Sequence, residues 1–165
     1  MQWKVFVYGT LKQGYGNHQK YCQGVASVEP AVMWGRLFQL PQQYPMLLVP
    51  DSTVLTLGTS DPLADALTLQ QYTAAWPQHR PTISPAEIAG EWQWIAGEIL
   101  TSHHPLELMP QLDALEGFVP DGASLYHRAL VPVQADWSSP VWVYISPNSQ
   151  LPAGAYPIGS SWPPG

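Results

Sequence analysis

The chain has 165 residues, the usual size of one compact domain, and 45 % of them are hydrophobic. Its 18 prolines and 13 glycines exclude a long helical bundle or coiled coil, because proline breaks helices and central strands. Six Lys and Arg against twelve Asp and Glu give a net charge of −6, which leaves too few cations for a phosphate-neutralising surface, so nucleic acid is not an expected partner.

The first fifty residues are predicted to form strands joined by turns. The β-branched and aromatic run at residues 3–7 indicates a strand that ends in a glycine-containing turn at residues 8–11. A short helix is predicted at residues 17–23. Strands follow at residues 31–40 and 44–49, separated by Pro41 and Pro45.

Residues 51–94 differ from the strand-like segments on either side of them, and we interpret them as a surface insertion that carries two short helices. The first is expected to have Asp61 as its N-cap and Pro62 as its first residue, and to end before Pro77. Ser84 and Glu87 have the spacing of a capping box, which predicts the second. The stripe expected on the first helix consists of Leu63, Ala66, Leu67, Gln70 and Ala74.

The remaining elements indicate a mostly β protein with a few short helices. Strands are predicted at residues 91–101, 125–134 and 141–145, and a helix at residues 108–115, with Pro110 in its first position. Residues 1–146 are expected to form a single domain. The last twenty residues hold five prolines, so the tail at 147–165 is expected to be loose.

The single cysteine, Cys22, excludes an intrachain disulfide and a cysteine-rich zinc site. No apolar run approaches the roughly 18 residues of a membrane span, and no cationic stretch precedes an apolar run as in a signal peptide. We therefore expect a soluble cytoplasmic protein with no membrane partner.

Common catalytic motifs are absent from the sequence. It has no Gly-x-Ser-x-Gly elbow, no phosphate-binding loop and no His-Glu-x-x-His motif. His103 and His104 are adjacent and so point to different sides of a regular element, which disfavours a shared metal ion. No motif supplies a base for Cys22 as a nucleophile. No metal or cofactor is expected.

Two segments remain as candidates for chemistry. The turn Tyr8-Gly9-Thr10-Leu11-Lys12 ends a strand and can present successive N–H groups to an anion, although it is also compatible with an ordinary turn. Glu116 would end a short helix capped by Gly117. The helix dipole opposes its charge by about 0.3–1 kcal/mol, less than one pKa unit, so burial would have to supply the rest of a useful shift. A surface glutamate is the alternative.

Considered together, these segments resemble the gamma-glutamylcyclotransferase-like family, with the enzymes that act on gamma-glutamylamines as the nearest comparison. The N-terminal run Val-Phe-Val-Tyr-Gly-Thr-Leu-Lys-x-Gly and the following Asn17-His18 resemble the family's N-terminus. The resemblance continues in Tyr44-Pro45, Gly97-Glu98-Ile99, Leu112-Asp113-Ala114-Leu115-Glu116-Gly117-Phe118, Tyr126-His127-Arg128 and Val141-Trp142-Val143-Tyr144. It covers roughly residues 3–50 and 95–146.

The resemblance implies an α+β fold, a small mixed or antiparallel β-barrel with peripheral short helices. It further implies that Glu116 is the general acid/base. Arg128 matches a motif position with a supporting role. The residues that it implies for binding the gamma-glutamyl substrate are Tyr8, Gly9, Thr10, Leu11 and Tyr126.

The implied reaction is cyclisation of the gamma-glutamyl group of a small gamma-glutamyl amine, amino acid or peptide to pyroglutamate, with release of the amine. Nucleophile and electrophile are in one molecule, so the protein has to hold the reactive conformer and move a proton. The alternatives are a non-catalytic small-molecule binding or interaction module on the same fold, and acyl transfer through Cys22. Glu98 is the alternative catalytic carboxylate.

Overall fold

The computed structural model describes residues 1–76, 78–82, 90, 92–120, 122–133, 139–146 and 151–164. The helix predicted from Ser84 lies outside these residues. The helices are α1 (Gly16–Tyr21), α2 (Pro62–Ala74) and α4 (Pro105–Glu116), with a 3₁₀ turn, η1, at Asp51–Thr53. The strands are β1 (Trp3–Val7), β2 (Ser27–Gln39), β3 (Pro45–Leu48), β4 (Thr56–Leu57), β5 (Gln93–Ser102), β6 (His127–Val133), β7 (Ser139–Ile145) and β8 (Tyr156–Pro157). Among the described helices, none is long and apolar enough to cross a bilayer.

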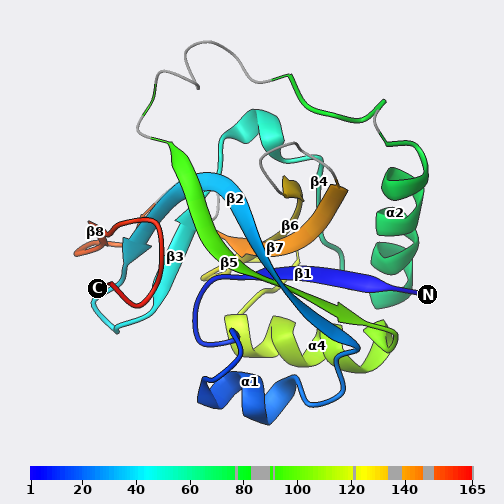
Figure 1. Ribbon diagram of the computed structural model, residues 1–165, viewed down its shortest axis with the longest axis horizontal. Coiled ribbons are helices and arrows are strands. Elements are labelled where there is room, and N and C mark those ends of the chain that lie inside the picture. Colours follow the sequence, from blue (N-terminus) through cyan, green and yellow to red (C-terminus); the bar gives the residue numbers. More distant parts are fainter. Residues whose placement is uncertain are drawn as a thin grey trace.

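The strands form one curled mixed sheet, a half-barrel, and the predicted α+β class is confirmed (Figure 1). Their order is β3-β2-β5-β1-β7-β6-β4, and β8 pairs with β2. Only the β1–β7 pair among the described strands is parallel. The long β2 and β5 strands pair over most of their length, from Ser27 with Thr101 to Gly35 with Gln93.

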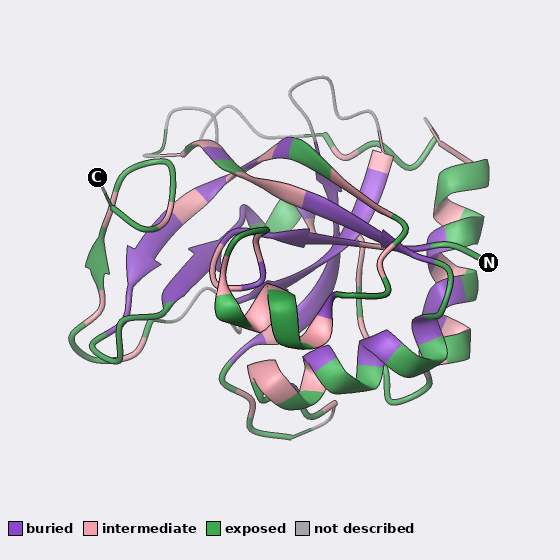
Figure 2. Ribbon diagram, turned by 60° about the horizontal axis from the view of Figure 1, so that its bottom comes forward, coloured by how far each residue is buried: buried purple, intermediate pink, exposed green. Residues whose placement is uncertain are grey.

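Alternate side chains of the strands enter two different cores, because successive residues of a strand point to opposite faces. In β1, Val5 packs in a core that also holds α4 side chains, and Phe6 packs in the core on the other face of the sheet. Trp142 and Val143 of β7 divide in the same way. Strands β6 and β7 are therefore buried on both faces, whereas the helices keep an exposed outer side (Figure 2).

Helix α4 confirms the predicted leucine spacing but not the predicted place of Pro110. The helix begins at Pro105, and Pro110 lies inside it with its ring exposed. Interior proline forfeits one backbone hydrogen bond. Complete burial of Met109 and Leu112 keeps this helix on the sheet in spite of that loss. At its other end, Gly117 has the left-handed conformation predicted for a cap, with φ of 66°.

Helix α2 has the predicted start, since the Asp61 carboxylate accepts hydrogen bonds from the backbone N–H groups of Leu63 and Ala64. Its predicted stripe is wrong in part, because Leu63 and Leu67 are exposed. The buried face carries Asp65, Ala66 and Leu69 instead. The reason for this different face is an ion pair, because Asp65 faces inward and pairs with the buried guanidinium of Arg128 at 2.8 Å.

The described part of the C-terminal tail is attached to the sheet, so the expectation of a loose tail is wrong for residues 151–164. Tyr156 pairs with Gln39, and the Ile158 N–H donates to the Leu37 carbonyl at 3.0 Å. The partly buried side chains of Ile158 and Trp162 pack on the core around Phe6. Burial of these apolar side chains offsets the loss of N–H donors at the prolines.

Candidate active site

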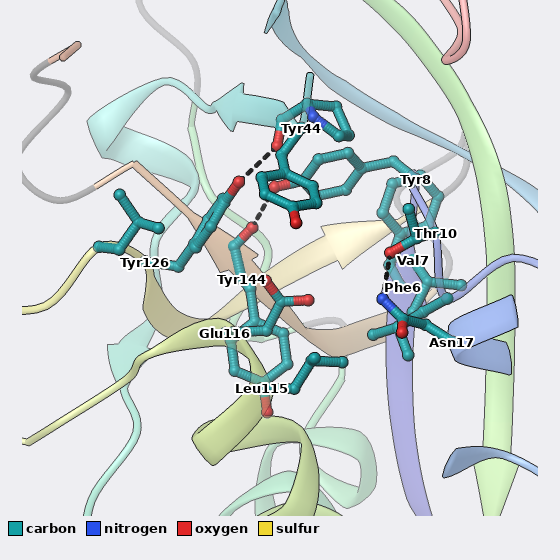
Figure 3. Close-up of a pocket in the computed structure, with 14 residues that line it drawn as sticks. Phe6, Val7, Tyr8, Thr10, Asn17, Tyr44, Leu115, Glu116, Tyr126 and Tyr144 are labelled. Carbon is teal, nitrogen blue, oxygen red and sulfur yellow. Dashed lines mark hydrogen bonds between the residues drawn. The ribbon is translucent and has the colours of Figure 1, made fainter. Parts of the chain in front are cut away.

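A cavity of about 260 Å³ lies where the end of β1 meets the end of α4. It collects side chains from six separate parts of the chain (Figure 3). All six residues predicted for the site line it. The complete lining is Phe6, Val7, Tyr8, Gly9, Thr10, Leu11, Asn17, Tyr44, Pro45, Leu115, Glu116, Leu125, Tyr126 and Tyr144.

The turn after β1 is held by three hydrogen bonds. The Gly9 carbonyl accepts from the Lys12 N–H at 3.1 Å, and Asn17 of α1 donates to the Thr10 hydroxyl at 2.8 Å. The His18 ring donates from Nδ1 to the Leu11 carbonyl at 2.8 Å. Within the described residues, the N–H groups of Gly9, Thr10 and Leu11 have no acceptor. The turn therefore keeps donors free beside the cavity, as an anion-binding nest requires.

Glycine is required at position 9 by a close approach. A Cβ atom at Gly9 would lie 2.7 Å from Cγ of Pro45, which forms another wall of the cavity. A positive φ is not the reason, because the described glycines with positive φ are Gly14, Gly117 and Gly154. The turn and the start of β3 thus pack against each other through the missing side chain.

Glu116 is the last residue of α4 and brings the only charged side chain to the described lining of the cavity. Its carboxyl group points into the space bordered by Tyr126, Tyr144 and the Tyr8–Thr10 backbone (Figure 3). Burial raises the pKa of Glu116 from its ordinary value of 4.5 to about 7. At neutral pH this carboxyl group therefore accepts and donates a proton with similar ease.

The tyrosines around Glu116 serve as walls and do not compete for its proton. The Tyr8 hydroxyl donates to the Tyr144 carbonyl, and the Tyr126 hydroxyl donates to the Pro45 carbonyl, both at 2.6 Å. Burial, with the nearby Glu116 charge as a smaller cause, raises the pKa of each of these two hydroxyls above its ordinary value. Both remain neutral phenols in the range where Glu116 titrates.

Arg128 lies behind this wall, where it ties α4 to α2. Its guanidinium binds both carboxylate oxygens of Asp113, at 2.8 and 3.0 Å, and one oxygen of Asp65 at 2.8 Å. Asp113 also accepts from the Tyr144 hydroxyl at 2.6 Å. Since Asp113 is one helical turn before Glu116, this network fixes the end of the helix that carries Glu116.

The other chemical candidates lie elsewhere. Glu98 is not among the lining residues, and its carboxylate accepts from the Gln13 N–H at 2.8 Å. Cys22 is buried, and burial raises the pKa of its thiol to about 11, so the thiolate is scarce at neutral pH. His103 and His104 are exposed. The described residues include no cluster of three or more His, Cys, Asp or Glu side chains suited to a metal ion.

Sequence reasoning about the site missed the contribution of Asn17 and Tyr144. Asn17 holds the turn through Thr10, and Tyr144 joins the cavity wall to Asp113. Both stand within the matched motifs, but no spacing rule connects them to the turn or to Asp113, because the contacts depend on the parallel β1–β7 pair and on the placement of α1.

Three comparisons with known proteins bear on the identity of this fold. No curated protein sequence matches the chain. The solved structure of an AIG2-like protein from Mus musculus matches 92 % of this chain and 80 % of its own, with 19 % sequence identity and a TM-score of 0.52. An allophanate hydrolase from Kluyveromyces lactis matches 98 % of this chain but 20 % of its own, with 14 % identity and a TM-score of 0.55. At these identities, both structures show the fold alone.

The sequence model of a family described as "Gamma-glutamyl cyclotransferase, AIG2-like" matches residues 5–59 and 53–163. These ranges include both the turn after β1 and Glu116. The chain belongs to the gamma-glutamyl cyclotransferase, AIG2-like family.

Proposed function

We propose that this protein is an enzyme that cyclises the gamma-glutamyl group of a small gamma-glutamyl amine, amino acid or peptide to pyroglutamate. The observation that carries the proposal is the pairing of two features in one cavity. A carboxyl group with a pKa of about 7 stands across from a turn whose N–H groups have no acceptor in the described chain. Family membership supports the same activity.

The turn is the proposed binding site for the alpha-carboxylate of the gamma-glutamyl group. Three consecutive backbone donors at Gly9, Thr10 and Leu11 suit a carboxylate, and the described lining offers no Lys or Arg side chain for that purpose. The buried rings of Tyr8 and Tyr126 would exclude water from the reacting atoms.

Glu116 is the proposed general acid/base. The neutral alpha-amine attacks the gamma-carbonyl carbon, a new C–N bond closes the five-membered ring, and the bond to the leaving nitrogen breaks. The attacking nitrogen loses one proton and the leaving nitrogen gains one, so a single carboxylate that accepts the first proton can donate it to the second. The products are pyroglutamate and a free amine.

The direct test is to incubate the purified protein with a panel of gamma-glutamyl amines, amino acids and peptides and to measure pyroglutamate release. We expect release from at least one class above the rate without protein. Binding of panel members without release would contradict the enzyme and support a non-catalytic binding module. Loss of activity on thiol alkylation would instead favour acyl transfer through Cys22.

A further inference from the structure

The C-terminal segment contacts residues that are adjacent to two walls of the candidate active site. After β8, the Ser160 carbonyl accepts from the Ala96 N–H of β5 at 2.8 Å, which fixes the chain just before Trp162. Figure 1 shows this segment looping beside the end of β2 and the start of β3. Trp162 is therefore held by the sheet on its N-terminal side, and its own contacts are with residues next to two different walls of the cavity.

On one side, Trp162 is attached to the segment that follows the turn after β1. The Lys12 ammonium donates a hydrogen bond to the Trp162 carbonyl. The Trp162 ring lies 5.4 Å from the Tyr15 ring between centroids, and the Lys12 Nζ atom lies 5.7 Å from the Tyr15 centroid. Because the Lys12 N–H closes the turn on the Gly9 carbonyl, a displacement of Lys12 displaces the turn.

On the other side, Trp162 is attached to the corner between β2 and β3. Its indole Nε1–H donates to the side-chain oxygen of Gln39 at 2.9 Å. Gln39 is 4 % exposed and pairs with Pro45 across the two strands. Tyr44 and Pro45 line the cavity opposite the turn. One residue therefore contacts the supports of two cavity walls that are more than thirty residues apart in the sequence.

We propose that Trp162 is a positioning residue that sets the separation between the Gly9–Leu11 turn and the Tyr44–Pro45 corner, with Lys12 and Gln39 as its two attachments. Neither Trp162 nor Lys12 lines the cavity, so their effect on the substrate is indirect. A turn held in its binding geometry before the substrate arrives avoids the ordering cost at binding. The inference rests on the proposed function where it treats the turn as the substrate site.

Three variants test it in the full-length protein. Trp162→Ala removes the ring and the indole donor, and Lys12→Met keeps the aliphatic stem but removes the ammonium. Gln93→Ala is the matched control, because Gln93 donates to the Gly159 carbonyl of the same segment at 3.3 Å and contacts neither wall. Steady-state kinetics use the gamma-glutamyl compound that the wild-type protein cyclises fastest. Lys12→Met also serves if Trp162→Ala does not fold.

We expect KM to rise about 3- to 10-fold in Trp162→Ala and Lys12→Met, while kcat changes less than twofold. This rise in KM corresponds to the loss of one hydrogen bond, about 0.5–1.5 kcal/mol. Gln93→Ala should match the wild type. An unchanged KM in both variants, a fall in kcat alone, or an equal rise in KM in Gln93→Ala would overturn the proposal.

A second measurement does not depend on turnover. Amide hydrogen exchange by NMR in the ligand-free protein should accelerate at positions 12 and 13 in Trp162→Ala and Lys12→Met, because the Lys12 and Gln13 N–H groups donate to the Gly9 carbonyl and to Glu98. Unchanged exchange would overturn the positioning role of Trp162 even if the enzyme is active. If the wild type releases no pyroglutamate but exchange accelerates, the proposed function fails and the positioning role of Trp162 stands.

Discussion

The Glu116 carboxyl group has a pKa near 7 because it loses water, and its place at the end of a helix adds little. The helix dipole contributes less than one pKa unit at such a position. The change from 4.5 to about 7 exceeds this, and its first cause is burial. The residues that surround it in the cavity come from β1 and the turn after it, from the start of β3, from residues 125–126 and from β7, so a helix alone would not tune this residue.

The raised pKa predicts a stability that falls as pH rises. The folded protein binds the Glu116 proton more tightly than the unfolded chain does, so the free energy of unfolding decreases between about pH 4.5 and pH 7. Glu116→Gln removes this dependence. We expect the melting temperature of the variant relative to wild type to increase by roughly 6–12 °C between pH 4.5 and pH 8, because a change of this size in pKa corresponds to about 3 kcal/mol. A constant difference across this range, measured by calorimetry, would show that Glu116 is not buried as described.

Gly9 is predicted to matter more for substrate binding than for stability. In Gly9→Val, the added side chain meets Pro45 and pushes the turn away from the β3 corner. We expect KM to rise at least tenfold while the melting temperature falls by only a few degrees. Gly16→Val is the control, since a Cβ at Gly16 meets no atom within 4 Å. Normal binding and turnover in Gly9→Val would argue against the anion-binding role of the turn.

At the scale of elements, the end of α4 depends on the pair formed by Asp113 and Arg128. In Asp113→Asn, the buried Arg128 guanidinium keeps its ion pair with Asp65 but loses its bidentate ion pair with Asp113. Breaking such a pair costs about 3 kcal/mol, so the melting temperature should fall by roughly 6–12 °C. Glu107→Gln removes an exposed carboxylate from the first turn of the same helix, so it should lower the melting temperature by at most a few degrees and leave activity unchanged. If the two variants melt alike, the network does not hold α4.

Local patterns predicted the elements of this fold better than their orientations. The strand before the turn, the Asp61 cap and the Gly117 cap each depend on neighbouring residues, and the structure has all three. The inward face of α2 depends on Arg128, which is 63 residues from Asp65, and no local pattern encodes that contact. The predicted place of Pro110 was wrong for a similar reason, because tertiary packing stabilises a helix that an interior proline weakens.

The site was predicted as a set of residues but without its supports. Motif resemblance named Glu116 and the residues of the turn, and the structure brings them to one cavity. The motif resemblance did not explain why position 9 is glycine. The reason is evident only from the short distance between a Cβ at Gly9 and Pro45. The C-terminal segment was misjudged because its proline count outweighed the apolar side chains that attach it to the sheet.

At the scale of the whole molecule, residues 51–94 remain a proposed insertion on a domain formed by residues 3–50 and 95–146. Strand β4 of this segment pairs with β6, and Asp65 of the segment forms an ion pair with Arg128. Replacing about residues 55–90 with a flexible linker should therefore lower the melting temperature but leave cooperative unfolding intact. Circular dichroism during thermal unfolding measures this. A replaced chain without any cooperative transition would make the segment part of the core.

The most direct test of the account is the turnover of Glu116→Gln, compared with Glu98→Gln at equal protein concentration. Glutamine keeps the size and hydrogen-bonding reach of Glu116 but cannot transfer the proton. Because general acid–base catalysis contributes about 10²–10⁴-fold, we expect pyroglutamate release by Glu116→Gln to fall at least 100-fold, with substrate binding retained at the turn. Glu98→Gln should stay within a few-fold of wild type. Near-full turnover in Glu116→Gln together with an inactive Glu98→Gln would contradict the assignment of the catalytic carboxylate.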